Sequence, residues 1–137
     1  MDAYVDSSVV LRIVLHEPAR LRAWGRIDAM WTSELTRVEC FRVIDRARLS
    51  GQLGDIAVAT ARQRVDELFE SIELVAIDRR VLRRAAQPMP TTLRSLDAIH
   101  IASALSVRAR VPALSLATHD DEMATAAKAL GFRVLGV

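Results

Sequence analysis

The sequence predicts an α/β fold, with a parallel β-sheet flanked by helices in one domain. Short apolar runs alternate along the chain with amphipathic stretches, which is the pattern of parallel strands joined by crossover helices. The chain has 137 residues, of which 51% are hydrophobic, and this is enough to build one core. Because no linker, internal repeat or low-complexity tract interrupts it, we expect a single domain over residues 1–137.

Five short apolar runs predict the strands of this sheet. Each run is bounded by residues that favour turns or helix starts, and each is too short to be a complete helix. The predicted strands are Ala3–Val5, Met30–Thr32, Ile72–Ile77, Ala113–Ala117 and Arg133–Leu135.

Helices are predicted between the strands, because capping residues and amphipathic spacing recur there. Pro18 suits the first turn of a helix, Ser33, Asp55 and Asp78 can cap helix N-termini, and Gly131 can end one. The predicted helices cover residues 7–15, 18–27, 34–49, 55–70, 78–86, 95–108 and about 121–130.

The composition excludes several classes of protein. The single cysteine, Cys40, cannot form an internal disulfide, and no Cys/His cluster has zinc spacing. The most apolar stretch, Val9–Leu15, contains Arg12 and is too short to span a bilayer, so we expect a cytoplasmic protein. All basic residues except Lys128 are arginines, which suits phosphate contacts and equally suits ordinary solvated faces.

Four acidic residues lie in apolar surroundings, where an unpaired ionised carboxylate costs free energy. Asp6 and Asp120 follow the first and fourth predicted strands, so both should lie at the carboxyl edge of the sheet, where parallel sheets bind ligands. Glu39 and Asp97 interrupt apolar stripes on predicted helices and should face inward. Capping can explain an aspartate after a strand, but it does not explain a carboxylate within an apolar stripe. A shared divalent cation would explain all four.

Four segments of the chain resemble the motifs of PIN-domain ribonucleases, in order and spacing. They are Val5–Leu11, Ser33–Glu39, Ser95–Ala104 and Leu116–Asp120, and Ala126–Val134 is similar to the closing helix and strand of that family. The closest likeness is to VapC toxins. The resemblance implies a Rossmann-like PIN domain and a metal-dependent endoribonuclease, the toxin of a toxin–antitoxin pair.

The resemblance also implies the residues of the site. Asp6, Glu39, Asp97 and Asp120 would bind Mg²⁺ or Mn²⁺ and carry catalysis, and Ser7 and Thr118 would support them by hydrogen bonding. Bound metal would supply a hydroxide for attack on the phosphodiester. A VapB-like antitoxin and a second copy of the chain would be the protein partners.

The fourth carboxylate has an alternative, because Asp121 and Glu122 follow Asp120 directly. The Thr-x-Asp spacing favours Asp120, and acids in a first helical turn are explained by the helix dipole. Asp121 remains the possible substitute.

Other polar residues receive weaker assignments. His100 is expected to be a hydrogen-bonded structural residue rather than a ligand or base, and His119 to line the rim of the site. Trp24 and Trp31 fit core or interface packing better than base stacking. The predicted RNA contacts are Arg37, Arg42 and Arg46, near Glu39 on the same helix.

Two further expectations concern association and an alternative function. Leu21, Trp24, Ile56 and Val65 are predicted to offer a surface for self-association. The alternative to an enzyme is a non-catalytic module that binds RNA or protein, since acids and arginines also occur in domains that only bind.

Overall fold

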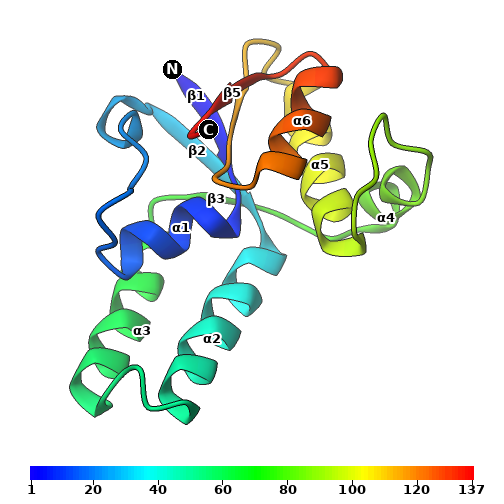
Figure 1. Cartoon of the computed structure of the whole chain (residues 1–137). Coiled ribbons are helices and arrows are strands. Elements are labelled where there is room, and N and C mark those ends of the chain that lie inside the picture. Colours follow the sequence, from blue (N-terminus) through cyan, green and yellow to red (C-terminus); the bar gives the residue numbers. More distant parts are fainter.

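Five parallel strands form one sheet at the centre of the molecule (Figure 1). The computed structural model describes residues 1–137. Its strand order is β3-β2-β1-β4-β5, and every neighbouring pair is parallel. The predicted α/β fold is therefore confirmed. The strands are β1 (Asp2–Val5), β2 (Ala29–Ser33), β3 (Glu73–Val75), β4 (Ser115–Ala117) and β5 (Arg133–Leu135).

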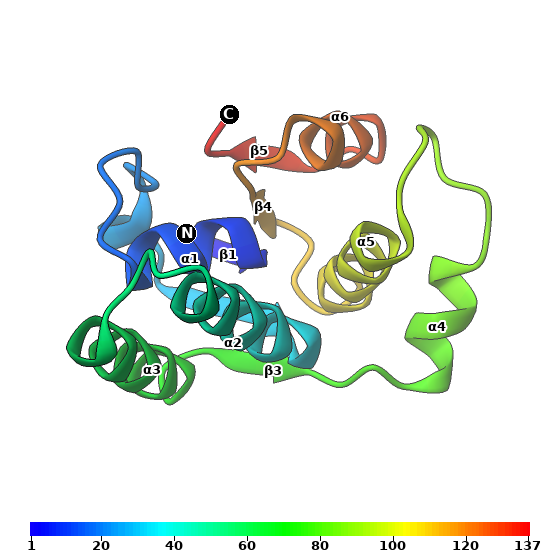
Figure 2. The ribbon, with the colours of Figure 1, turned by 60° about the horizontal axis from the view of Figure 1, so that its bottom comes forward.

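Six α-helices cover the two faces of the sheet. Figures 1 and 2 show α1, α2 and α3 on one side and α5 and α6 on the other, with α4 outside α5. The ends of α2 and α3 extend beyond the sheet as an antiparallel pair (Figure 1). No helix combines the length and the hydrophobicity that crossing a membrane requires. The helices are α1 (Ser7–Val14), α2 (Glu34–Leu49), α3 (Asp55–Phe69), α4 (Arg79–Ala85), α5 (Ser95–Arg108) and α6 (Asp121–Ala129).

The sheet separates two hydrophobic cores, and β1 contributes to both. Ala3 and Val5 pack in the core that contains α1, α2 and α3, whereas Tyr4 packs in the core that contains α5 and α6. All three side chains are fully buried. Successive side chains of a strand point to opposite faces, so a central strand covered on both faces is apolar throughout. Asp6 directly follows this strand, so the packing of β1 on both faces fixes its position.

The helix predicted over residues 18–27 is wrong. Only a single 3-10 turn forms there, at Trp24–Arg26. Residues 22 and 23 form the turn that leads into it, and both Leu21 and Ala23 are buried. Gly25 also disfavours a helix at this point. The connection between α1 and β2 is therefore irregular, and it fills the core with alternate residues.

One predicted cap, Asp55, is also wrong, although the helix it was expected to start is present. Gly54 is the N-cap of α3, so Asp55 is the first residue of the helix instead. Asp78 does cap α4, since its carboxylate accepts a hydrogen bond from the Val81 amide at 2.9 Å. The third strand is shorter than predicted, because only residues 73–75 pair with β2.

Candidate active site

The two predicted acids that follow strands meet at the point where the strand order reverses. From β1 the chain continues to β2 on one side of the sheet, and β4 pairs with β1 on the other side. In parallel sheets a crevice opens beyond the carboxyl ends of the two strands at such a point. Asp6 directly follows β1, and Thr118 to Asp120 follow β4.

Asp6 is the most buried acid of this crevice, with 2% of its surface exposed. Its Oδ1 accepts hydrogen bonds from Ser8 Oγ at 2.6 Å and from the Val9 amide at 3.1 Å, so it also caps α1. Its Oδ2 accepts one from Thr118 Oγ1 at 2.6 Å. Burial nevertheless raises the pKa of Asp6 above its usual value. A carboxylate has about four lone-pair sites, and three are used here.

Glu39 is held by side chains from two other helices. Ser7 Oγ donates to Glu39 Oε2 at 3.2 Å, and Glu39 Oε1 lies 2.6 Å from His100 Nε2. Because an ionised carboxylate only accepts, Nε2 donates this bond. The other ring nitrogen, Nδ1, lies 2.7 Å from the Tyr4 hydroxyl, within the second core. The residues Tyr4, His100 and Glu39 thus form a continuous chain from the core to the crevice.

His100 is therefore the hydrogen-bonded structural residue that the sequence suggests, with 1% of its surface exposed. Burial raises the pKa of Tyr4 well above its usual range, so the hydroxyl keeps its proton and can donate to Nδ1. Tyr4 was not among the predicted site residues. Its apolar neighbours in the sequence give no sign that its hydroxyl faces a histidine nearly 100 positions later.

Asp97 and Asp120 complete the group of acids. Asp97 lies in the first turn of α5 and is partly exposed, and Asp120 caps α6 by accepting from the Met123 amide at 2.9 Å. Burial raises the pKa of Asp97, and the charges of Asp120, Asp6 and Glu39 raise it further. Repulsion of this kind requires proximity, so Asp120, Asp6 and Glu39 each lie within electrostatic reach of Asp97.

Asp121 differs from Asp120 in its surroundings. It is exposed, it lies in the first turn of α6, and its side chain accepts no hydrogen bond. Asp120 also receives a bond at its backbone amide, which donates to Thr118 Oγ1 at 2.9 Å. Thr118 thus joins Asp6 to the residue at the start of α6.

Ser8 is a further residue of the site that the sequence did not predict. Its hydroxyl donates to Asp6 and accepts from the His119 amide at 2.9 Å, so it ties α1 to the loop after β4. The signal that could have found it is local. A serine two positions after an N-cap aspartate can hydrogen-bond to that carboxylate.

The acids fit a hard divalent cation by their chemistry. Carboxylate oxygens are the ligands that Mg²⁺ and Mn²⁺ prefer, and Asp6 and Glu39 both keep lone pairs that the protein does not use. In this arrangement no group of three or more His, Cys, Asp or Glu side chains is placed to hold a metal ion.

The predicted RNA contacts lie along α2, and two of them are paired within the chain. Arg37 forms an ion pair with Asp66 at 2.7 Å, and Arg42 forms one with Asp45 at 3.1 Å. Arg46 is exposed and forms no ion pair. Both pairs are exposed at the surface, so each contributes little to stability, and the arginines can exchange their carboxylate partners for another anion.

The tryptophans and the remaining histidines have structural surroundings. Trp31 is buried and donates from Nε1 to Glu73 Oε2 at 2.9 Å, and Trp24 packs against the first core. His16 is exposed. His119 donates from Nδ1 to the Gly136 carbonyl at 2.8 Å, so its ring faces away from the acids.

The raised pKa of Asp97 predicts a dependence of stability on pH in the metal-free protein. The folded chain holds this proton more tightly than the unfolded chain, where the pKa is about 3.8. The associated stability is therefore complete below that value and is lost as the pH rises through the folded-state pKa. Asp97→Asn removes the charge and breaks no hydrogen bond of the native side chain.

We expect this variant to melt at the same temperature as the native chain near pH 4, and at a higher temperature near pH 7, both in EDTA. The measurement is a thermal melt followed by circular dichroism across this range, with Asp121→Asn as the control. An equal or lower melting temperature for Asp97→Asn at neutral pH would contradict the repulsion described above.

The chain belongs to the PIN domain family, whose model matches residues 3–129. Among curated proteins it is similar to Ribonuclease VapC46 of Mycobacterium tuberculosis, with 35% identity over 96% of this chain and 95% of that protein. Ribonuclease VapC47 of the same organism is 30% identical over 94% of this chain and 92% of its own length. Within the PIN domain family, the chain therefore belongs with the VapC ribonucleases.

Solved structures share this fold at low sequence identity. A member of the VapBC family of toxin–antitoxin systems, VapBC-5 from M. tuberculosis, has a TM-score of 0.65 and 21% identity, and it covers all of both chains. M. tuberculosis VapC20, a toxin that cleaves the sarcin–ricin loop, has a TM-score of 0.63 and 18% identity over 96% of each chain. They support the assignment of the fold.

Proposed function

We propose that the chain is a metal-dependent endoribonuclease and the toxin of a toxin–antitoxin pair. The observation that carries the proposal is that the charges of Asp6, Glu39 and Asp120 raise the pKa of Asp97, which supports a shared acidic site at the carboxyl edge of the sheet. Relatives that match nearly the whole chain are named ribonucleases, which favours RNA as the substrate.

The four carboxylates would hold Mg²⁺ or Mn²⁺, with Asp120 favoured over Asp121 as the fourth ligand. When bound, the cation would supply a hydroxide near neutral pH and would shield the scissile phosphate from the acids. The protein residues orient the acids. Ser8 and Thr118 fix both oxygens of Asp6, and Ser7 and His100 fix those of Glu39.

Arg37, Arg42 and Arg46 on α2 would contact the RNA backbone. Their charges lie on the helix that carries Glu39, and the pairs that Arg37 and Arg42 make are exposed. Phosphate contacts of this kind position the substrate without selecting its sequence.

The protein partners would be a VapB-like antitoxin and a second copy of the chain, in the cytoplasm. Large apolar side chains on the helices remain exposed, including Ile56 at 84%, Leu49 at 71% and Val38 at 58%. Surfaces of this kind favour association. Leu21 and Val65, which were predicted to contribute, are buried in the core and do not.

The test is cleavage of end-labelled RNA by the native chain with Mg²⁺, with Mn²⁺ and with excess EDTA. We expect cleavage with either cation and none with EDTA, because the site contains only oxygen ligands for a metal that must supply the nucleophile. A chain that binds the RNA in EDTA but does not cut it with either cation would instead be a non-catalytic binding module. Undiminished cleavage in EDTA would overturn the metal-dependent mechanism.

A further inference from the structure

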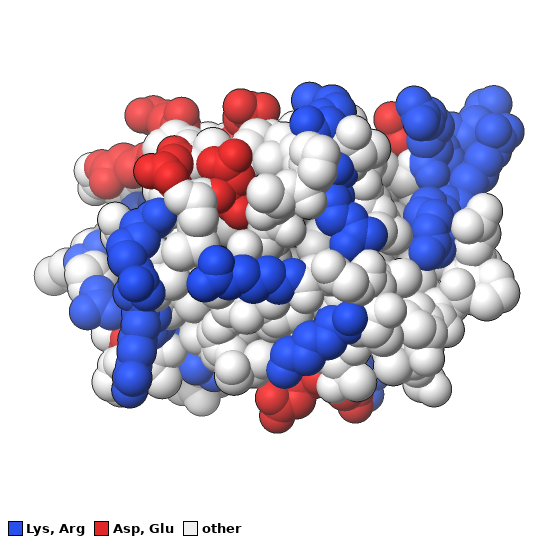
Figure 3. Space-filling model, turned by 90° about the horizontal axis from the view of Figure 1, so that it is seen from above, with Lys and Arg blue, Asp and Glu red and all other residues white.

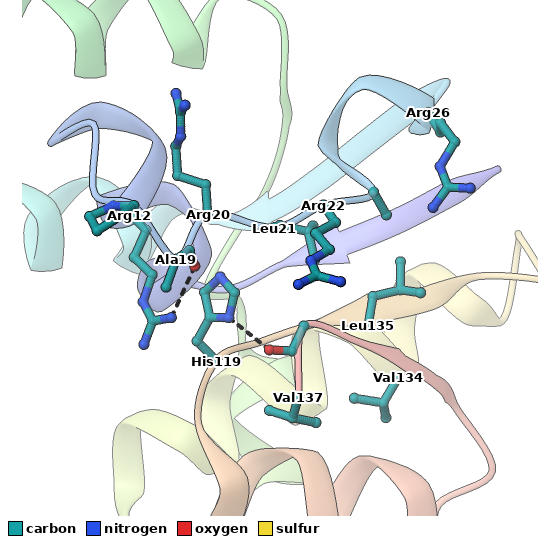
Figure 4. A pocket seen from close by; sticks show the side chains of 13 residues that line it. Arg12, Ala19, Arg20, Leu21, Arg22, Arg26, His119, Val134, Leu135 and Val137 are labelled. Carbon is teal, nitrogen blue, oxygen red and sulfur yellow. Dashed lines mark hydrogen bonds between the residues drawn. The ribbon is translucent and has the colours of Figure 1, made fainter.

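A second concave site lies beside the acidic crevice, and neither the predicted site residues nor the proposed mechanism uses it. This site, here called the arginine pocket, has a volume of about 670 Å³. Its walls come from α1, from the irregular connection between α1 and β2, from the loop after β4 and from the residues at and after β5 (Figure 4). Its lining includes the side chains of Arg12, Arg22, Arg26, His119, Leu21 and Leu135.

The charge of the pocket is positive and largely unpaired. Four arginines line it, together with His119, and no Asp or Glu does. Arg20, Arg22 and Arg26 form no ion pair, whereas Arg12 lies 3.7 Å from Glu17 and donates to the Ala19 carbonyl. In Figure 4 the guanidinium group of Arg22 lies between Leu21 and Leu135, while that of Arg20 points away from the other side chains. Unpaired guanidinium groups bind phosphate in a bidentate manner.

The pocket is shaped to take more than a bare ion. Leu21 and Leu135 provide an apolar surface beside the arginines. His119 Nε2 is buried and has no hydrogen-bond partner in the protein, while Nδ1 donates to Gly136. Gly136 closes the wall tightly, since a Cβ there would lie 2.5 Å from the Thr118 carbonyl oxygen. Apolar and cationic groups in one cavity suit a nucleotide, which presents a base, a sugar and a phosphate.

The pocket and the acidic crevice share a wall. The His119 amide donates to Ser8 Oγ, and Ser8 donates to Asp6, while the His119 ring faces the pocket. Arg12 lies on α1, the helix that Asp6 caps, about one and a half turns beyond its start. Four carboxylates repel a nucleic acid backbone, so cations must hold the RNA on either side of the cleavage point. The pocket supplies such cations on one side.

Arginine and lysine side chains cross the face seen from above in separate groups rather than as one continuous patch (Figure 3). Some of them lie on the side where the connection between α1 and β2 runs in Figure 1. Net charge alone, which is only +2, does not distinguish among these groups. The concave shape and the shared wall distinguish the arginine pocket from the others.

We infer that the arginine pocket binds a nucleotide of the RNA substrate next to the scissile phosphate, with Arg22 and Arg26 on its phosphate groups. This inference rests on the proposed function and identifies where that substrate is held. It places the main backbone contacts in the connection between α1 and β2, on different elements from the arginines of α2.

The test is binding of a fluorescein-labelled single-stranded RNA oligonucleotide, followed by anisotropy in EDTA over a series of KCl concentrations. The native chain is compared with Arg22→Gln/Arg26→Gln and with Arg79→Gln/Arg80→Gln. The second variant removes two exposed arginines of α4 and gives the same change of net charge. Thermal melts check that each variant is folded.

We expect the pocket variant to bind about tenfold or more weakly at low salt. Its plot of log affinity against log salt should be shallower by about 0.7 for each phosphate of the single strand that the variant no longer neutralises. The α4 variant should stay near the native curve. An equal weakening of RNA binding in the two variants would overturn the inference, because it would show a response to charge alone.

A glutamate-rich peptide serves as a second probe, because unpaired arginines also bind carboxylates. If the pocket variant lost affinity for the peptide and kept its affinity for RNA, the pocket would be a protein-binding site and the inference would fail. The outcome is separable from the proposed function. Pocket-dependent binding without cleavage in Mg²⁺ would reject the nuclease and keep the pocket, and cleavage with unchanged binding by the pocket variant would do the reverse.

Discussion

Asp97→Asn is expected to abolish metal-dependent cleavage of RNA, lowering the rate by about 1,000-fold or more, while the chain stays folded. A bound metal stabilises the transition state by several kcal/mol, and about 4 kcal/mol corresponds to about a thousandfold change in rate. The side chain of Asp97 makes no hydrogen bond, and its charge is repelled by Asp120, Asp6 and Glu39. Its replacement would therefore remove a proposed metal ligand and leave the hydrogen bonds of the fold in place.

The neighbouring acids provide a matched pair of variants for the same assay. Asp120→Asn keeps the cap of α6, because asparagine caps a helix as well as aspartate does. We expect it to lose about 100-fold or more in rate, and Asp121→Asn to stay within about threefold of the native chain. The measurement is initial cleavage rate at several Mg²⁺ concentrations. The opposite order would make Asp121 the fourth ligand.

His100→Leu is expected to lower both activity and stability. Loss of a residue that orients a metal ligand costs about 10- to 100-fold in metal affinity or activity. The substitution frees one oxygen of Glu39 and removes one hydrogen bond of the buried Tyr4 hydroxyl, which costs about 0.5–1.5 kcal/mol. Urea unfolding measures the second effect, and the Mg²⁺ dependence of cleavage measures the first.

Tyr4→Phe separates these two effects. It removes the hydroxyl, keeps the ring in the core, and leaves the bond between His100 and Glu39 in place. We expect it to reduce stability by about 1 kcal/mol and to change the Mg²⁺ dependence less than His100→Leu does. If His100→Leu cut RNA with native rate and native Mg²⁺ dependence, the histidine would have no role in positioning Glu39.

Much of this arrangement could be predicted from the sequence, because the strands and the long helices have strong local signals. Apolar runs indicated the strands, and two acids after strands together with two in helical stripes indicated a common crevice. The signal was strongest where burial and charge conflict, as at Glu39, because a carboxylate in an apolar stripe requires a partner. That partner is His100, which the sequence indicated as structural.

The remaining features depend on tertiary contacts that leave no local pattern. The segment of residues 18–27 has apolar residues at spacings that suit a helix, yet packing selects an irregular path that buries Leu21 and Ala23 together. Tyr4 was missed for the same reason, since its partner is His100, nearly a hundred positions away. Contacts between residues so far apart in the sequence cannot be predicted from hydrophobic periodicity.

The bond from Thr118 to Asp6 spans 112 positions of the sequence, and it has a consequence for synthesis in the cell. A nascent chain on the ribosome contains Asp6 more than a hundred residues before it gains Thr118 and Asp120. Premature termination products would therefore lack the crevice altogether. A polypeptide that is still being translated cannot form these contacts until Thr118 and Asp120 have been added to it.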